Sequence, residues 1–366
     1  MFSDNHKISL RQLQALLLLY FLGTSSLFLP AELAAESGRA CWIVMLCGGL
    51  AASLFSLVLT TLMARAPHWT GVEWVRYGFG NLLGTVFAVG FALKLAIDAM
   101  LELRIFSEIL CRTMLPQTPV WVLVAVLLLL SAFGVARGIE GQARAAEILF
   151  FFVFVPFLLL LAGVALTIDE AYFLPLDLPD FTMLRKGAAA IQPLFQAMLF
   201  LLFLPPYLEK PTQTKKSVLG VCLTTTILMS VVTFLCLTVY GVEALEHKIF
   251  PTLQVAERIS FSGIFLGRQD IFLLWFWMVS AFLYISGALF FGSVCSARIL
   301  RQKQKKQRYW LFLWVPILFV GAMVLQDMES AYAFRNLIQP FLSAFLLAVL
   351  PLYCLYKSRK WKKGGI

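Results

Sequence analysis

Three charged residues stand at helical spacing in one of the most hydrophobic stretches of the chain, residues 91–116. Lys94, Asp98 and Glu102 are each four residues apart, so on a helix their side chains form one slowly drifting stripe. An ionisable group at the centre of a bilayer costs about 2.5–3.5 kcal/mol on the insertion scale. If this stretch crosses a membrane, the three charged side chains must face other parts of the protein, water or one another.

The depth of these three residues in the bilayer determines which chemistry they can perform. The hydrophobic run extends over residues 82–115, and because ~20 residues cross the hydrocarbon core, the stripe lies near the midplane. Desolvated carboxylates titrate readily. The stripe could therefore relay a proton or another cation, contact a charged ligand, or form a structural network in which Lys94 pairs with Asp98. We favour a relay or ligand role, because intramembrane charge is functional by default.

A second pair of charges, Arg104 and Glu108, lies closer to the outer end of the same run. These residues are again four apart and can meet on one face of a helix. We interpret them as a structural ion pair that fixes how this helix docks.

The composition identifies the class of protein that must position these charges. The chain has 366 residues, of which 60% are hydrophobic and 14% charged, and its mean hydropathy is +0.84. Soluble domains are typically ~45–50% apolar and ~25% charged. The sequence therefore predicts an all-α polytopic membrane protein, and residues 1–12 are polar, with no persuasive cleavable signal after them.

Motifs for metal or covalent chemistry are missing from the sequence. The seven Cys are scattered singly in or beside hydrophobic runs, and the three His are isolated, which predicts neither a metal site nor a disulfide framework. No HExxH, GxSxG or Gly-rich phosphate loop occurs. We therefore expect no metal, no cofactor and no enzymatic activity.

Hydrophobic runs of the length needed to cross a bilayer, roughly 20 residues, recur along the whole chain. Ten transmembrane helices are expected, at residues 10–36, 40–64, 82–115, 120–136, 145–167, 191–207, 218–240, 271–300, 309–325 and 337–356. Most Lys and Arg residues fall in the segments that are cytoplasmic if the N-terminus is inside, which predicts that both termini are cytoplasmic. The basic loop and tail then contact anionic membrane lipid, and the net charge of +10 requires no nucleic-acid partner.

Two of the expected spans are interrupted. The first contains Gly23-Thr24-Ser25-Ser26 near its middle, and the sixth contains Pro193, Gln196 and Pro205-Pro206. Interrupted segments at equivalent positions of two halves indicate an inverted-repeat transporter architecture. The small residues of the first span could instead mark a close helix crossing, but we favour the broken helix.

This symmetry divides the chain into two five-helix repeats, residues 1–167 and 191–357. An extracytoplasmic loop, residues 168–190, joins them, and residues 358–366 form a basic cytoplasmic tail. The second repeat contains an outer loop, residues 241–270, whose middle is amphipathic and is expected to form a short helix.

Several short motifs in this order are typical of one family. LRIFSEI at residues 103–109, PQTP at 116–119, LRKGAAA at 184–190, FPTLQVAERIS at 250–260 and GRQD at 267–270 resemble the spore germination permease family. This family is the membrane-embedded B subunit of nutrient germinant receptors, within the amino acid–polyamine–organocation superfamily. The resemblance implies a LeuT-like 5+5 inverted repeat with broken helices 1 and 6.

The resemblance also implies a function. The chain would bind a small nutrient such as an amino acid in a transporter-like central cavity and signal germination by a conformational change. Its partners would be the A- and C-type receptor subunits in the inner membrane of the spore. The alternative is an amino-acid permease, with proton coupling through the charged stripe as an option.

In this fold the ligand would lie among spans one, three, six and eight. A half-helix N-terminus attracts a carboxylate, and Gly23 to Ser26 would supply it, with the hydroxyls of Thr24, Ser25 and Ser26. The remaining ligand-binding residues implied are Phe195, Gln196 and Phe200 from span six and Ser280 and Tyr284 from span eight. The last two could equally serve helix packing.

Overall fold

The computed structural model describes residues 7–23, 25–167, 172, 177–257, 270–302 and 307–359. Throughout these ranges the secondary structure is helical, with one isolated bridge and no strand. The helices are α1 (Leu10–Phe21), α2 (Ser25–Ser37), α3 (Cys41–Arg65), α4 (Gly71–Phe79), α5 (Asn81–Thr113), α6 (Val120–Ala136), α7 (Gly138–Val164), α8 (Phe181–Ile191), α9 (Met198–Leu201), α10 (Thr214–Glu246), α11 (Pro251–Glu257), α12 (Asp270–Ile299), α13 (Gln307–Val324), α14 (Met328–Ser343) and α15 (Leu350–Ser358).

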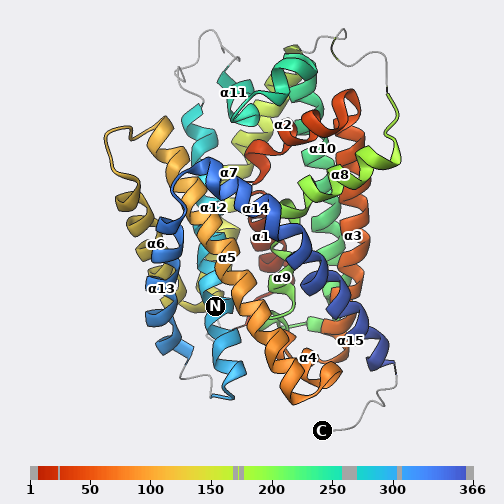
Figure 1. Cartoon of the computed structure of the whole chain (residues 1–366), viewed down its shortest axis with the longest axis vertical. Coiled ribbons are helices and arrows are strands. Elements are labelled where there is room, and N and C mark those ends of the chain that lie inside the picture. Colours follow the sequence, from red (N-terminus) through yellow and green to blue (C-terminus); the bar gives the residue numbers. More distant parts are fainter. Residues whose placement is uncertain are drawn as a thin grey trace.

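The long helices run mostly along the long axis of the molecule, with α11 at one end and α4 at the other (Figure 1). Six described helical stretches are long and apolar enough to cross a membrane: Ser26–Arg65, Asn81–Thr113, Gly138–Val164, Pro211–Glu246, Leu274–Ile299 and Met328–Ser358. Three shorter apolar helices accompany them, Leu10–Phe21, Val120–Ala136 and Tyr309–Val324. The protein is therefore an all-helical, multi-pass membrane protein, as the composition predicts.

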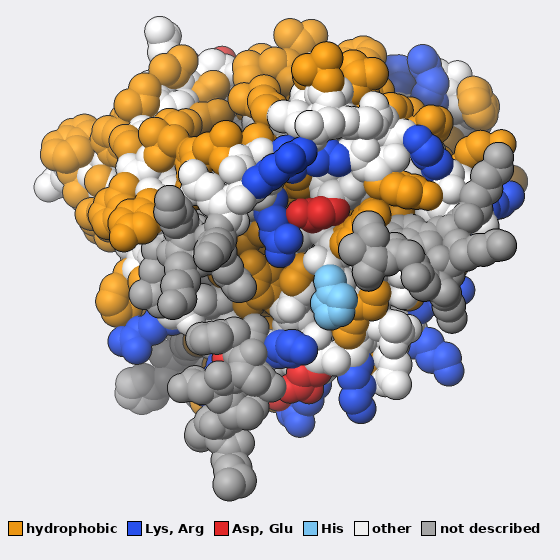
Figure 2. Space-filling model, turned by 90° about the horizontal axis from the view of Figure 1, so that it is seen from below, with side chains coloured by type: hydrophobic (Ala, Val, Ile, Leu, Met, Phe, Trp, Pro, Cys, Tyr) orange, Lys and Arg blue, Asp and Glu red, His pale blue; other side chains and the backbone are white. Residues whose placement is uncertain are grey.

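The outer surface is suited to lipid. Large apolar side chains such as Leu82, Phe133 and Phe152 are exposed by 81%, 64% and 76%. Figure 2 views the end that carries α4, where Lys and Arg side chains are spread over the face and hydrophobic side chains gather along part of its edge.

Helix α5, which carries the charged stripe, packs against α4, α6, α12, α13 and α14. All five charged residues from Lys94 to Glu108 are buried, with exposures of 8% or less. Because their neighbours are protein rather than lipid, the cost of placing charge in the membrane is met by contacts inside the bundle.

The first hydrophobic run consists of two helices. Helix α1 ends at Phe21 and α2 begins at Ser25, and the backbone N–H of Ser26 donates to the carbonyl of Gly23 at 3.0 Å. Thr24 lies outside the described residues, and of Ser25 only the backbone is described. The backbone thus leaves the α-helix at the small residues that the sequence indicates.

Residues 191–207, expected as the sixth span, form short pieces: a 3-10 turn at Gln192–Phe195, the one-turn helix α9, and a second turn at Pro205–Tyr207. Pro193 and the Pro205-Pro206 pair lack the N–H groups that a continuous helix requires. Helix α8 precedes these pieces, within the segment expected as the outer loop. Asp180 caps it, accepting from the N–H of Met183 at 2.7 Å.

The lower ends of the two interrupted regions are tied together. The N–H of Ile8 donates to the carbonyl of Tyr207 at 2.8 Å, and the N–H of Glu209 donates to the carbonyl of Ile8 at 3.1 Å. The segment before α1 therefore pairs with the segment after the second interruption and covers the bundle on its α4 side.

At the C-terminal end, α14 and α15 form one rod that crosses the front of the bundle (Figure 1). A π-helical turn at Ala344–Val349 joins them. Such turns occur frequently at functional sites, and this one directly follows Ser343, which belongs to the buried network described below.

Candidate functional site

The centre of the site is a closed ring of three buried side chains, Lys94 and Asp98 from α5 and Gln339 from α14. The Lys94 ammonium donates to both carboxylate oxygens of Asp98 at 2.6 Å and to Oε1 of Gln339. Nε2 of Gln339 in turn donates to Oδ1 of Asp98. Lys94, Asp98 and Gln339 are exposed by 0%, 1% and 2%. A buried ion pair needs such additional hydrogen bonds to offset its desolvation.

A series of hydrogen bonds continues from this ring to the second interrupted segment. The hydroxyl of Ser343 donates to Oε1 of Gln339 at 3.3 Å, and Nε2 of Gln192 donates to the Ser343 hydroxyl at 2.6 Å. These hydrogen bonds therefore connect α5, the start of the π-helical turn and the segment before α9. Sequence reasoning missed Gln192, Gln339 and Ser343, although polar residues in apolar runs were the available signal.

Glu102, the third member of the stripe, faces the interruption of the first run. A Cβ atom added to Gly23 would lie 3.2 Å from Oε1 of Glu102, so only glycine gives this carboxylate its full space. The N-terminus of α2 follows immediately, and its dipole favours a negative charge there. The carboxylate beside this break therefore comes from the protein's own α5.

The hydroxyl of Ser26 already makes hydrogen bonds within the protein. Its hydroxyl donates to the carbonyl of Gly23 at 2.9 Å and accepts from Nε1 of Trp277 at 2.8 Å. This contact ties the start of α2 to α12, so Ser26 orients the two helices in the present conformation.

A small cavity lies against the acidic side of α5. Its walls are Phe28, Asp98, Leu101, Glu102, Ile105, Gln196, Tyr332 and Arg335. Its volume is ≈10 Å³, about the space that one water molecule needs. The cavity brings together three predicted residues, Asp98, Glu102 and Gln196, and adds two from α14 that the sequence prediction omitted.

Three other predicted ligand residues, Phe195, Phe200 and Tyr284, make aromatic contacts and are absent from the cavity lining. The ring centroid of Phe200 is 5.0 Å from that of Tyr20, 5.2 Å from Tyr284 and 5.0 Å from Phe291, and Phe195 packs on Phe21 at 5.4 Å. These contacts are of the kind that stabilises a hydrophobic core.

Two hydroxyls in this region are buried and make no hydrogen bond within the described part of the chain, those of Ser280 and Tyr284. The electrostatic neighbours of Tyr284 include Asp98 and Glu102. Its ring therefore belongs to the aromatic cluster while its hydroxyl adds a polar group beside the two carboxylates.

An ion pair between α2 and α14 lies at the cavity wall, to which its Arg335 contributes. Nη2 of Arg335 contacts Oε1 of Glu32, and the guanidinium lies 4.4 Å from the ring centroid of Tyr332. The Tyr332 ring meets Phe28 edge-on at 4.8 Å, and its buried hydroxyl has no hydrogen-bond partner among the described residues. One cation and two aromatic rings thus form part of the cavity wall.

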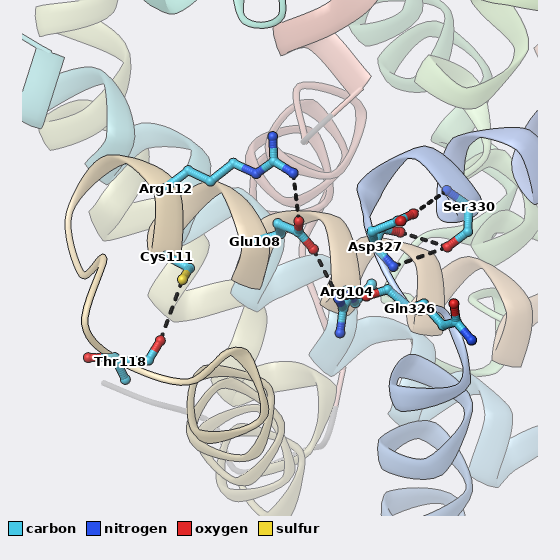
Figure 3. A network of polar contacts seen from close by, with 8 residues as sticks. All are labelled: Arg104, Glu108, Cys111, Arg112, Thr118, Gln326, Asp327 and Ser330. Carbon is cyan, nitrogen blue, oxygen red and sulfur yellow. Dashed lines mark hydrogen bonds and ion pairs between the residues drawn. The ribbon is translucent and has the colours of Figure 1, made fainter.

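The outer charges of α5 form a separate cluster (Figure 3). Glu108 lies between two guanidinium groups, 3.0 Å from Arg104 and 2.8 Å from Arg112. Arg104 also donates to the carbonyl of Gln326 at 2.5 Å. The pair predicted at Arg104 and Glu108 therefore fastens α5 to the connection that leads into α14.

The start of α14 is capped beside this cluster. Oδ1 of Asp327 accepts from the N–H of Ser330 at 2.7 Å. Hydrogen bonds from the backbone and the hydroxyl of Ser330 lower the pKa of the Asp327 carboxyl below its usual value, and the nearby Arg104 and Arg112 act in the same direction.

The fold and the interior charges together define a multi-pass membrane protein with an enclosed polar site. A family model described as "Spore germination protein" matches residues 7–331. The chain belongs to this family.

Three relatives from Bacillus subtilis (strain 168) are similar over nearly their whole length. "Spore germination protein YndE" is 23% identical over 368 residues, which cover 100% of this chain and 99% of the relative. "Spore germination protein KB" is 26% identical over 372 residues, covering 98% and 96%. "Spore germination protein B2" is 21% identical over 364 residues, covering 99% and 98%.

Proposed function

We propose that the chain is the membrane-embedded subunit of a spore nutrient germinant receptor in the inner membrane of the spore. It binds a small nutrient, an amino acid, at the cavity between α2, α5 and α14. The single observation that carries this proposal is the cavity itself, whose walls hold two carboxylates, an amide and a guanidinium in an otherwise apolar bundle. Sites for small ligands combine an apolar enclosure with a few convergent polar groups.

The signal is a conformational change. In the present conformation the cavity has space for about one water molecule, and a ligand must bind a different conformation better in order to shift the population. The interruptions at Gly23 and at residues 192–207 are where two five-helix repeats of a ten-helix, LeuT-like 5+5 arrangement would hinge. The A- and C-type subunits would receive this change, anionic lipid would contact the basic face, and no enzymatic step is involved.

One matched pair of variants tests the cavity. Gln196→Leu keeps the size of a cavity side chain and removes its amide, whereas Gln14→Leu makes the same substitution at an exposed position of α1. In spores that carry the variant as their only copy, Gln196→Leu should raise the concentration of nutrient needed for germination at least tenfold. Gln14→Leu should leave it unchanged. An unchanged response in both variants would exclude this cavity as the nutrient site.

An amino-acid permease is the second candidate, and one observation favours it. The Arg335–Glu32 pair joins α2 to α14 at the cavity wall, and the pairing of Ile8 with Tyr207 joins the segments before α1 and after α9. Alternating access needs contacts that can open and close on each side of a site. Proteoliposomes with the full chain alone separate the two functions. Saturable uptake of radiolabelled neutral L-amino acids would favour the permease, and binding without uptake would favour the receptor subunit.

A further inference from the structure

The wall of the cavity holds both acidic side chains and a cationic one. Asp98 and Glu102 project from α5, while Arg335 comes from α14 on the opposite helix of the cavity wall. Two buried hydroxyls lie near these charges, that of Tyr284 near the carboxylates and that of Tyr332 near the guanidinium. Charged and polar groups of both kinds in one small wall favour a ligand that carries both a positive and a negative charge.

The acidic and the cationic side chains of the cavity wall differ in how strongly they are paired with other residues. The Asp98 carboxylate is saturated by Lys94 and Gln339, inside a ring with almost no exposure. The partner of Arg335 is Glu32, and their side chains are exposed by 7% and 27%. The Glu32 carboxylate can leave Arg335 and be hydrated by water at a small cost in free energy. The buried Arg335 guanidinium, in contrast, requires an anion as its partner.

A guanidinium matches any carboxylate with a planar pair of donors. A carboxylate that enters the cavity could therefore replace Glu32 on Arg335 without leaving a buried cation unpaired. The break at Gly23 is a poorer place for that carboxylate, because Oε1 of Glu102 lies 3.2 Å from where a Gly23 Cβ would be. A second carboxylate beside Glu102 would be repelled by it.

We propose that the cavity takes a zwitterionic α-amino acid whose carboxylate displaces Glu32 from Arg335 and whose ammonium group lies beside Asp98 and Glu102. This inference rests on the proposed function, since it specifies the ligand of that same site and its orientation.

The exchange links binding to the conformational change. The Arg335–Glu32 pair ties α2 to α14, so a ligand that takes over Arg335 releases this tie. The amino acid then favours the conformation in which α2 and α14 separate, and the cavity enlarges beyond the space for one water molecule. Part of the binding free energy of the ligand offsets the loss of the Arg335–Glu32 pair. A substitution that weakens this pair should therefore raise the affinity for the ligand.

Equilibrium binding to the purified full-length chain tests the exchange. The probes are the neutral L-amino acids, of which L-alanine serves as the example, together with ethylamine and propionate, which each lack one charged end of L-alanine. Glu32→Gln should tighten binding of the amino acid about tenfold, because Arg335 no longer has a competing carboxylate. Arg335→Gln should weaken it about 100-fold. Ethylamine should bind far more weakly than L-alanine and should not respond to Glu32→Gln.

The chain offers a matched control one helical turn along α2. Glu36 forms an ion pair with Lys186 at 2.9 Å, and it is absent from the cavity lining. Glu36→Gln should leave every affinity unchanged. Since damage to the fold lowers affinity, the gain expected for Glu32→Gln cannot come from misfolding, and this variant decides the question even if Arg335→Gln does not fold.

The outcomes distinguish the inference from the proposed function. If amino acids bind but Glu32→Gln leaves the affinity unchanged or lowers it, the exchange is wrong and the receptor function stands. Equal binding of ethylamine and L-alanine would also overturn the exchange. If no neutral amino acid binds the wild-type chain or Glu32→Gln, the amino-acid site itself is wrong, and the inference fails with it.

Discussion

The Gly23 backbone and the Glu102 carboxylate meet at the break of the first hydrophobic run, where an added Cβ would lie 3.2 Å from Oε1 of Glu102. This distance is shorter than nearly all real Cβ contacts. The break therefore depends on a missing side chain at one residue and on a charge from another helix 79 positions further along the chain. A side chain at position 23 would therefore require the Glu102 carboxylate to shift by a few tenths of an ångström.

The first prediction concerns this close approach. Gly23→Ala should lower stability by roughly 1–3 kcal/mol, as overpacking of a core does, seen as a fall in the Tm of the purified protein. In a Glu102→Ala background the same substitution should cost much less, because the oxygen that it would crowd is gone. The control is Gly220→Ala in α10, where nothing lies within 4 Å of the added Cβ. An equal penalty for Gly23→Ala in both backgrounds would show that its space is limited by something other than Glu102.

The second prediction concerns the ring of Lys94, Asp98 and Gln339. Asp98→Leu alone should cost about 3–5 kcal/mol, because it leaves a buried ammonium group unpaired. Lys94→Met combined with Asp98→Leu should recover most of that stability, because the uncompensated charge disappears. Arg11→Gln, which breaks an ion pair whose Arg side chain is 71% exposed, should cost only about 0–1 kcal/mol.

The same double variant separates a structural role from a relay. A relay needs a titrating group at this position, so germination or uptake should be lost although the protein is folded. Full activity in the folded double variant would leave the Lys94–Asp98 pair with a structural role only.

The third prediction concerns the cluster around Glu108. The side chain of Arg104 is exposed by 8% and that of Arg112 by 47%. Arg104→Ala should therefore cost about 3–5 kcal/mol, as expected when one member of a buried pair is removed. Arg112→Ala should cost less than about 1 kcal/mol and lose even that effect at high salt. Comparable losses in the two variants would contradict the difference in burial.

The fourth prediction is a pH dependence at the start of α14. Because hydrogen bonds from Ser330 lower the pKa of Asp327 in the folded protein, this carboxylate contributes stability above its unfolded pKa of about 3.9. The contribution is lost as the pH falls through the lower folded value. Asp327→Ala should therefore lower the Tm by a constant amount near neutral pH, and the difference from wild type should shrink only below about pH 4. A difference that already disappears between pH 5 and 7 would point to another group.

Local features of the sequence determined the class of protein and several helix boundaries. The run of apolar residues at 120–136 coincides with α6, and the expected end of the seventh span at residue 240 precedes Gly241, whose φ of +71° breaks the helix. The helix break at Gly23 to Ser26 and the burial of the charged stripe also follow from residue type and spacing. Each of these depends on neighbours within a few turns, for which hydropathy and helical period carry the information.

The partners of the charged residues were decided only by the tertiary structure. Gln339 lies 241 positions from Asp98, and Arg335 lies 303 positions from Glu32, so no local pattern relates them. The aromatic packing of Phe200 and Tyr284, which the family resemblance placed at the ligand, likewise depends on how α1, α9 and α12 meet. A lone charge in a hydrophobic run shows that a partner is needed, because desolvation is costly. Which partner it finds depends on the docking of whole helices, and this also determines where the cavity lies.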